Sequence, residues 1–109
     1  MRRDVFQAIA DPIRRDIIGL LASQPLTVNE VANKFDVSRP AISKHLKILE
    51  ECGIVELNQQ GRERLCQIQA KNLIPAFMWI EQYKGLWEDK LDSFENYLAQ
   101  LQTKNKPNG

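Results

Sequence analysis

Apolar residues recur at helical spacing through the first part of the chain and predict a series of short helices. The first covers residues 4–10, where Phe6 and Ile9 share one side. Asp11-Pro12 predicts the start of a second helix, because Asp caps the free amide groups of a first turn and Pro already has the helical φ. This helix is expected to end at Ser23-Gln24-Pro25. Its core-facing stripe, spaced at i, i+4, i+7 and i+8, is Ile13, Ile17, Leu20 and Leu21.

A capping box predicts the third helix. In Thr27-Val28-Asn29-Glu30, the Thr and Glu side chains can each accept a hydrogen bond from the other's backbone amide. After a tight connection at Asp36-Val37, Ser38 is expected to cap a fourth helix that runs to about Glu51 and is closed by Gly53. Two helices joined so closely are typical of a helix-turn-helix. The third helix is expected to bury Val28, Val31, Ala32 and Phe35.

The pattern changes from helical to alternating beyond the fourth helix. Residues 54–58 alternate apolar and polar side chains, as a half-buried strand does. Gln59-Gln60-Gly61 predicts a turn, and residues 62–68 predict a return strand with Cys66 and Ile68 on one face. Together these segments predict a β-hairpin with an exposed basic tip.

One long helix is expected from about Asn72 to Gln102, followed by a polar, frayed tail over residues 103–109. Its apolar positions alternate in steps of four and three, which makes a heptad seam interrupted once by Lys84. The seam is Leu73, Phe77, Ile80, Lys84, Trp87, Leu91, Phe94, Leu98 and Leu101, and it is widened by Trp79, Tyr83, Leu86 and Tyr97.

Such a helix measures about 45 Å, which is too long for the small body of the protein to cover. Its excess apolar surface is therefore expected to meet a second copy of the chain, with a ligand pocket as the alternative use of its aromatic residues. The expected dimer interface, which includes part of the first helix, is Val5, Phe6, Ile9, Phe77, Ile80, Trp87, Leu91, Phe94 and Leu98.

Length and composition favour one soluble globular domain, expected over residues 1–102. The chain has 109 residues, of which 43% are hydrophobic and 27% are charged. No apolar run approaches the roughly 20 residues that cross a bilayer, and no apolar stretch follows the basic start as in a secretory signal. The sequence therefore predicts a cytoplasmic protein with no membrane partner.

The net charge of +1 argues by itself against a nucleic-acid partner, because domains that bind nucleic acid are usually basic. The distribution of charge changes this picture. Residues 37–49 contain basic side chains and no acidic one, and Arg62 and Arg64 form a second basic cluster that only Glu63 interrupts. DNA binding depends on such local positive charge placed against phosphates.

The fourth helix divides into two faces. Its apolar residues Ile42, Leu46 and Leu49 must face the core, so its polar and basic residues point outward, with His45 at the border. An outward face of Arg, Ser and Lys suits the major groove, although it is also compatible with a plain solvated face. The expected DNA contacts are Ser38, Arg39, Pro40, Ser43, Lys44, His45 and Lys47 on this helix, with Arg62 and Arg64 on the hairpin.

Three segments together resemble the ArsR-type (arsenical-resistance repressor) winged-helix regulators. Residues 37–49, Val-Ser-Arg-Pro-Ala-Ile-Ser-Lys-His-Leu-Lys-Ile-Leu, resemble their recognition helix. Residues 6–15 match their opening signature, and residues 53–55 with 61–62 match their wing. The resemblance implies a homodimeric bacterial transcription regulator, usually a repressor that binds an inverted repeat. It also implies DNA contacts at Ser38, Arg39, Ser43 and His45.

The metal ligands of this family are missing from the sequence. Metal-sensing members carry Cys-x-Cys at the start of the third helix, where this chain has Thr27 and Asn29. A second family site uses Asp and His from the last helix, which contains no His here. No metal and no cofactor is therefore expected. Cys52 and Cys66 are interpreted as small buried hydrophobic residues, with a thiol-based redox switch as the alternative.

No pattern typical of catalysis is present. The chain lacks a Gly-rich phosphate loop, and Glu50 and Glu51 diverge on their helix, so an enzyme is not expected. The sequence predicts a mainly α winged helix-turn-helix with a small β-hairpin and a long C-terminal dimerisation helix. The predicted function is a homodimeric DNA-binding repressor in the bacterial cytoplasm. A protein-interaction module that no longer binds DNA and a redox-sensing regulator stay open, and no motif identifies the operator, the inducer or the regulated genes.

Overall fold

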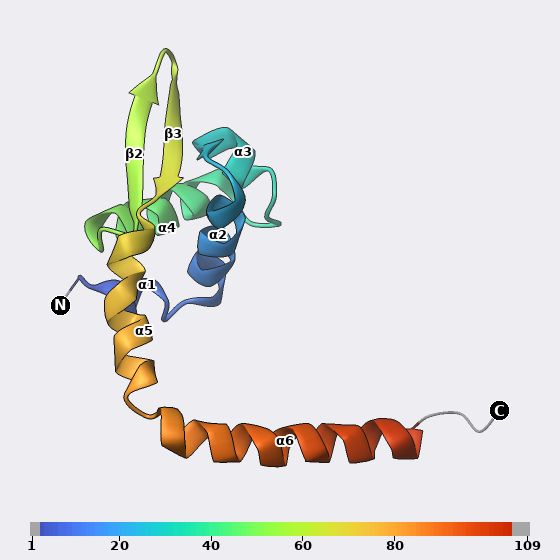
Figure 1. Ribbon diagram of the computed structural model, residues 1–109. Helices are drawn as coiled ribbons and strands as arrows, with labels where there is room; N and C mark the ends of the chain where they lie inside the picture. Colours follow the sequence, from blue (N-terminus) through green and yellow to red (C-terminus); the bar gives the residue numbers. More distant parts are fainter. Residues whose placement is uncertain (1–2, 106–109) are drawn as a thin grey trace. The chain divides into compact units, whose positions relative to one another are not determined.

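The computed structural model describes residues 3–105, except for the side chains of Trp87 and of residues 103–105 (Figure 1). The chain divides into two compact units, Met1–Ala76 and Phe77–Gly109. The single domain expected over residues 1–102 stays a prediction. The elements in chain order are α1 (Val5–Ala8), α2 (Pro12–Ser23), β1 (Leu26–Thr27), α3 (Val28–Ala32), α4 (Arg39–Glu51), β2 (Val55–Gln60), β3 (Glu63–Ile68), the 3₁₀ helix η1 (Ala70–Leu73), α5 (Ile74–Glu81) and α6 (Lys84–Asn105). The first unit is the predicted winged helix-turn-helix.

Two arginine side chains of α2 donate hydrogen bonds to the C-terminal end of α1. α1 begins at its cap Asp4 and ends at Ala8, two residues earlier than predicted. Arg14 donates from Nε to the Ala8 carbonyl (3.1 Å) and from Nη2 to the Gln7 carbonyl (2.9 Å). Arg15 donates from Nη1 to the Ile9 carbonyl at 2.7 Å. Side chains at the start of α2 therefore donate additional hydrogen bonds to carbonyl groups at the end of α1.

The predicted caps of the helix-turn-helix are confirmed. The Thr27 amide donates to Glu30 Oε1 (2.9 Å) and the Glu30 amide donates to Thr27 Oγ1 (3.1 Å), which completes the capping box of α3. Ser38 Oγ accepts from the Ala41 amide at 3.2 Å and caps α4. After α4, Gly53 has a φ of +77°, and the amides of residues 53 and 54 bond to the carbonyls of residues 50 and 49. This pairing is a Schellman motif, which favours Gly because of the positive φ.

The wing belongs to a three-stranded antiparallel sheet in the order β1-β3-β2. The hairpin register runs from Val55 opposite Ile68 to Gln60 opposite Glu63, so Gly61 and Arg62 alone form the turn. The predicted turn at residues 59–61 therefore starts too early, because Gln59 and Gln60 belong to β2. The sequence predicts only the two strands of the hairpin, so the third strand of the sheet, β1, was not predicted.

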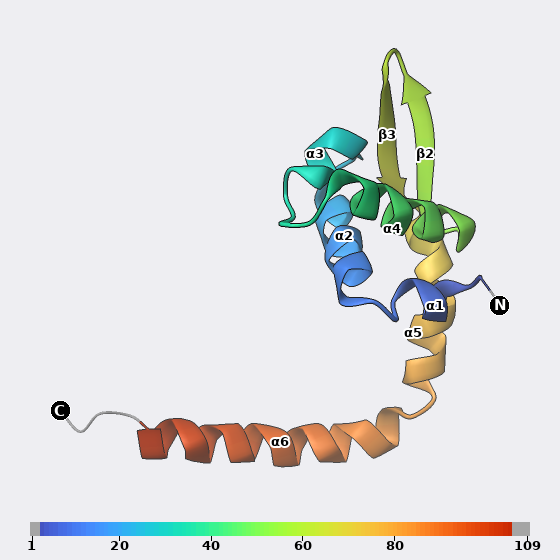
Figure 2. The same ribbon diagram turned by 180° about the vertical axis from the view of Figure 1, so that it is seen from behind.

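The core of the first unit lies where the helices meet the base of the sheet. The apolar faces predicted for α2 and α4 are confirmed there. Figures 1 and 2 show the hairpin projecting beyond this helical part of the unit. Val5 also packs in this core and is only 5% exposed. The largest fully buried side chains are Ile17, Leu21, Val31, Ile42, Leu46, Leu49, Ile54, Val55 and Cys66.

The long C-terminal helix predicted from the heptad seam is present as α6, but residues 72–102 do not form one continuous helix. The structure has η1, α5 and α6 instead, with a turn at residues 82–83. The amides of Tyr83 and Leu86 bond to the carbonyls of Ile80 and Tyr83, which are three residues back, so the regular α-helical ladder is interrupted. Gly85 follows this turn and has a low helix propensity. α6 reaches Asn105, and residues 106–109 of the predicted tail lie outside the described residues.

No helix in the described part of the chain is both long and apolar enough to cross a membrane.

Candidate nucleic-acid interface

α4 presents the polar face that the sequence predicts. Its side chains Arg39, Pro40, Ser43, Lys44 and Lys47 are exposed, and the opposite face is buried in the core. The exposed Ser38 precedes them at the N-cap. Because its hydroxyl oxygen accepts from the Ala41 amide, its proton can still be donated outward. The first turn of α4 therefore offers both side-chain donors and the positive end of the helix.

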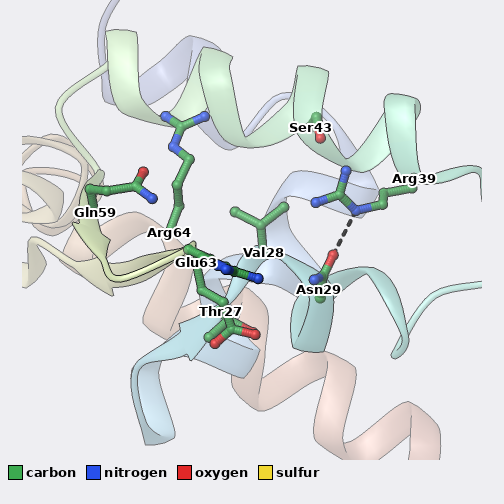
Figure 3. A pocket seen from close by; sticks show the side chains of 9 residues that line it. Thr27, Val28, Asn29, Arg39, Ser43, Gln59, Glu63 and Arg64 are labelled. Carbon is green, nitrogen blue, oxygen red and sulfur yellow. Dashed lines mark hydrogen bonds between the residues drawn. The ribbon is translucent and has the colours of Figure 1, made fainter.

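A cleft of about 220 Å³ lies between α3, α4 and the wing. Figure 3 shows the side chains that surround it. Three of them are guanidinium groups and only one is a carboxylate, so the cleft suits an anionic partner. The lining residues are Thr27, Val28, Asn29, Arg39, Ser43, Gln59, Arg62, Glu63 and Arg64.

Arg39 is fixed across the helix-turn-helix by a residue that sequence reasoning missed. Its Nε donates to Asn29 Oδ1 at 2.7 Å, from the first turn of α4 to the first turn of α3 (Figure 3). The two residues are ten positions apart and share no local motif. The contact depends on the packing of α3 against α4, which the sequence does not give. The only signal in the sequence is that Asn29, within the capping-box segment, is polar.

A second hollow follows α4 toward the wing. It is lined by Ser43, Lys44, Lys47, Glu50, Leu57 and Arg64. It shares Ser43 and Arg64 with the cleft, so the structure brings the predicted basic residues of α4 and of the hairpin to the same side of the unit. Arg62 is exposed in the hairpin turn and lines the cleft only.

His45 differs from the other predicted DNA contacts because its side chain is only 19% exposed. Its buried Nδ1 lies 3.8 Å from Asp11 Oδ2 and makes no hydrogen bond. Partial burial raises the pKa of Asp11, but the hydrogen bond from the Arg14 amide and the nearby His45 and Arg14 charges outweigh it and hold that pKa below its ordinary value. This edge of the imidazole therefore faces the start of α2.

Neither cysteine has the surroundings of a reactive thiol. Cys66 is fully buried, and this burial raises its pKa to about 11. Cys52 is half-buried, and burial raises its pKa as well. Both thiols are therefore protonated at neutral pH, whereas the thiolate is the reactive form.

The residues at the family's metal-ligand positions do not fit a metal ion. Thr27 Oγ1 accepts from the Glu30 amide, and Asn29 Oδ1 accepts from Arg39. Within residues 3–105, no group of three or more His, Cys, Asp or Glu side chains could hold a metal ion.

The residues predicted for dimerisation fall in both units. In the first unit, Val5 is buried, Ile9 is half-buried and Phe6 is 41% exposed. In the second unit, Phe77 is 62% exposed, and the side chain of Trp87 lies outside the described residues. The other predicted interface residues of that unit are also exposed: Ile80, Leu91, Phe94 and Leu98.

Comparison with known proteins places this geometry in a family. The model of the family described as "Bacterial regulatory protein, arsR family" matches residues 11–56, from the cap of α2 into β2. The chain is 39% identical over 77 residues to the transcriptional repressor SdpR of Bacillus subtilis (strain 168), an alignment that covers 71% of this chain and 86% of that protein. It is 43% identical over 68 residues to the HTH-type transcriptional regulator Rv2034 of Mycobacterium tuberculosis (strain ATCC 25618 / H37Rv), covering 62% of this chain and 64% of that protein.

A solved structure agrees with these relatives. The crystal structure of an ArsR family transcriptional regulator superposes with a TM-score of 0.68 at 40% identity, over 76% of this chain and 91% of that chain. Both the resemblance and the winged helix-turn-helix fold predicted from the sequence are confirmed. The chain belongs to the arsR family of bacterial regulatory proteins and is a transcriptional regulator.

Proposed function

We propose that this regulator is a homodimeric repressor that binds an inverted-repeat operator through α4 and the wing. The observation that carries the proposal is the cleft in which Arg39, Arg62 and Arg64 converge beside the exposed face of α4. Its similarity to SdpR, which is named a transcriptional repressor, supports the direction of regulation.

The exposed residues of α4 divide by chemistry into two groups. Arg39 can donate two hydrogen bonds to guanine O6 and N7, and Ser43 can donate to or accept from a base edge. Lys44 and Lys47 carry compact charges that suit phosphate groups, as do Arg62 and Arg64 on the wing. The half-buried His45 contributes less than the sequence predicts, because its Nδ1 faces Asp11. Pro40 has no amide proton to donate and acts through contact alone.

The second unit supplies the proposed dimer contact. Its exposed residues Phe77, Ile80, Leu91, Phe94 and Leu98 are large and apolar, and a second copy of the chain can cover them in a symmetric interface. In the first unit, the half-buried Ile9 and the exposed Phe6 can contact the second copy as well, whereas Val5 is used within the core of its own unit. A dimer would place two α4 helices in successive major grooves about 34 Å apart.

Selection of duplexes from random DNA with the full chain tests the proposal. The enriched sequence should be an inverted repeat with half-site centres about 10 base pairs apart. Fluorescence anisotropy titrations should then give an affinity at least about 1,000-fold higher for that sequence than for a scrambled duplex at physiological salt. Failure to enrich any sequence would contradict the proposal and favour the protein-interaction module.

The raised pKa of Cys66 argues against the redox-sensing alternative, because a buried protonated thiol reacts poorly with oxidants.

A further inference from the structure

We infer that Asn29 is a specificity-determining positioning residue, which holds the Arg39 guanidinium in the orientation that reads a base. The inference rests on the proposed DNA-binding function. Its basis is the 2.7 Å hydrogen bond from Arg39 Nε to Asn29 Oδ1, between two exposed side chains at the rim of the cleft (Figure 3).

The atom that Asn29 engages decides what Arg39 can still bind. A guanidinium has five N–H donors, of which Nε contributes one and the two terminal nitrogens contribute four. With Nε bonded to Asn29, the edge formed by Nη1 and Nη2 can still donate to a further acceptor pair. That edge matches the O6 and N7 acceptors of guanine in the major groove. The bond therefore selects one binding edge of Arg39 before DNA arrives.

The backbone that carries Asn29 is held by the capping box of α3. Asn29 lies in the first turn of α3, between the two partners of the capping box, Thr27 and Glu30. The neighbouring residues Val28 and Val31 are buried in the core. A long exposed Arg side chain loses rotamer freedom when it binds, and a bond to a fixed partner reduces that loss.

The neutral amide of Asn29 has a further consequence. A carboxylate at this position would also accept from Arg39 Nε and would bind it more strongly. It would, however, cancel the positive charge of Arg39 and repel phosphate groups. Asn29 orients the guanidinium while it leaves the full charge available to the DNA.

A double-mutant cycle on the selected operator tests the inference. The variants are Asn29→Ala, Arg39→Ala and the double variant, and the control is Asn33→Ala, which removes an exposed amide from the end of the same short helix. Anisotropy titrations measure the affinity of each for the operator and for duplexes changed at each half-site base pair. Wild-type protein should lose about tenfold or more in affinity when the base pair read by Arg39 is changed.

Asn29→Ala should lower this discrimination toward the value of Arg39→Ala, and the double variant should discriminate no worse than Arg39→Ala alone. Asn29→Asp should retain the discrimination but bind every duplex more weakly, with a shallower salt dependence, and Asn33→Ala should behave as wild type. Asn29→Asp also keeps the test decisive if Asn29→Ala does not fold, because it preserves an acceptor for Nε. The inference would be overturned, with the proposed function intact, by either of two results. One is that the two substitutions reduce discrimination independently; the other is that Asn29→Ala weakens binding to all duplexes equally and leaves discrimination unchanged. Absence of any discrimination by the wild-type chain would instead overturn the proposed function.

Discussion

Arg39 and Arg62 carry the same charge at the same cleft, but their surroundings give them different roles. Arg39 lies in the first turn of α4 and is held by Asn29, so its direction is set by the helix-turn-helix. Arg62 is exposed in the two-residue turn of the hairpin. Directed hydrogen bonds to bases give sequence preference, whereas contacts to phosphate give affinity that falls with salt.

Alanine substitutions should separate these two roles. Arg39→Ala is expected to reduce discrimination at one base pair of each half-site by about 1–3 kcal/mol. Arg62→Ala is expected to weaken binding to all duplexes similarly and to reduce the slope of log Kd against log salt by about 1. Anisotropy titrations over a range of salt concentrations measure both effects. Lys71→Ala, which removes one exposed positive charge outside the cleft, is the matched control. Equal effects of the two arginine variants on every duplex would contradict the assignment.

Asp11 should make the stability of the fold depend on pH. A carboxyl whose pKa is lowered by folding stabilises the protein above its unfolded pKa, here about 3.8, and this contribution is lost as the pH falls through the lower folded value. Asp11→Asn keeps an N-cap but removes the charge, so it should be less stable than wild type at pH 7. The difference in Tm should shrink as the pH falls below 3.8.

Asp11→Ala also removes the cap and should cost about 1 kcal/mol in the free energy of unfolding at pH 7. Asp16→Asn, an exposed carboxyl on the same helix, is the control. A difference between wild type and Asp11→Asn that stays constant with pH would contradict this role of Asp11.

At the scale of elements, helix boundaries were predictable wherever a local signal sets them. Asp11, Thr27 and Ser38 each cap a helix through a bond to an amide three residues later, so the sequence alone contains the whole interaction. The exposed face of α4 was equally predictable, because its buried residues recur at helical spacing.

Elements that depend on distant partners escaped prediction. β1 has only two residues, and it forms because Leu26 and Thr27 pair with Cys66 and Leu65, far along the chain. The bond between Arg39 and Asn29 depends in the same way on how two helices pack. The break before α6 has a local cause, but the heptad count concealed it because apolar residues continue on both sides.

Two glycine substitutions should have opposite effects on the helices. Gly85 lies in the first turn of α6, without a positive φ, and an added Cβ would meet no atom within 4 Å. Gly85→Ala should therefore raise helix content and stabilise the helix by up to about 1 kcal/mol. Gly53→Ala should destabilise the protein by about 1–2 kcal/mol, because Gly53 has a φ of +77°. Circular dichroism and urea unfolding measure both, and a loss of helicity in Gly85→Ala would refute the explanation of the break.

At the scale of the whole molecule, a net charge of +1 conceals a strongly uneven surface. In the first unit, Arg39, Arg62 and Arg64 line one cleft, and the second unit exposes large apolar residues along α6. Near neutrality keeps non-specific attraction to DNA modest, so selective binding must depend on directed contacts and on two copies acting together.

A charge on the apolar seam of α6 should therefore separate the two copies. Phe94→Asp is expected to shift the protein from dimer to monomer in sedimentation velocity and to weaken operator binding by roughly 100-fold or more, because each monomer holds one half-site. Gln100→Asp introduces the same charge on the same helix, outside the seam, and should leave both properties unchanged. A Phe94→Asp protein that remains dimeric would show that the interface lies elsewhere.

Thr27 belongs at once to β1, which pairs with the wing strand β3, and to the N-cap of α3. One residue thus joins the sheet to the helix-turn-helix, and the separation between α4 and the hairpin tip follows from the fold. A duplex must then present its groove edge and its flanking backbone at a matching separation. Operators with the correct bases but a different groove width would bind less well, so the regulator would sense the local shape of DNA in addition to its sequence.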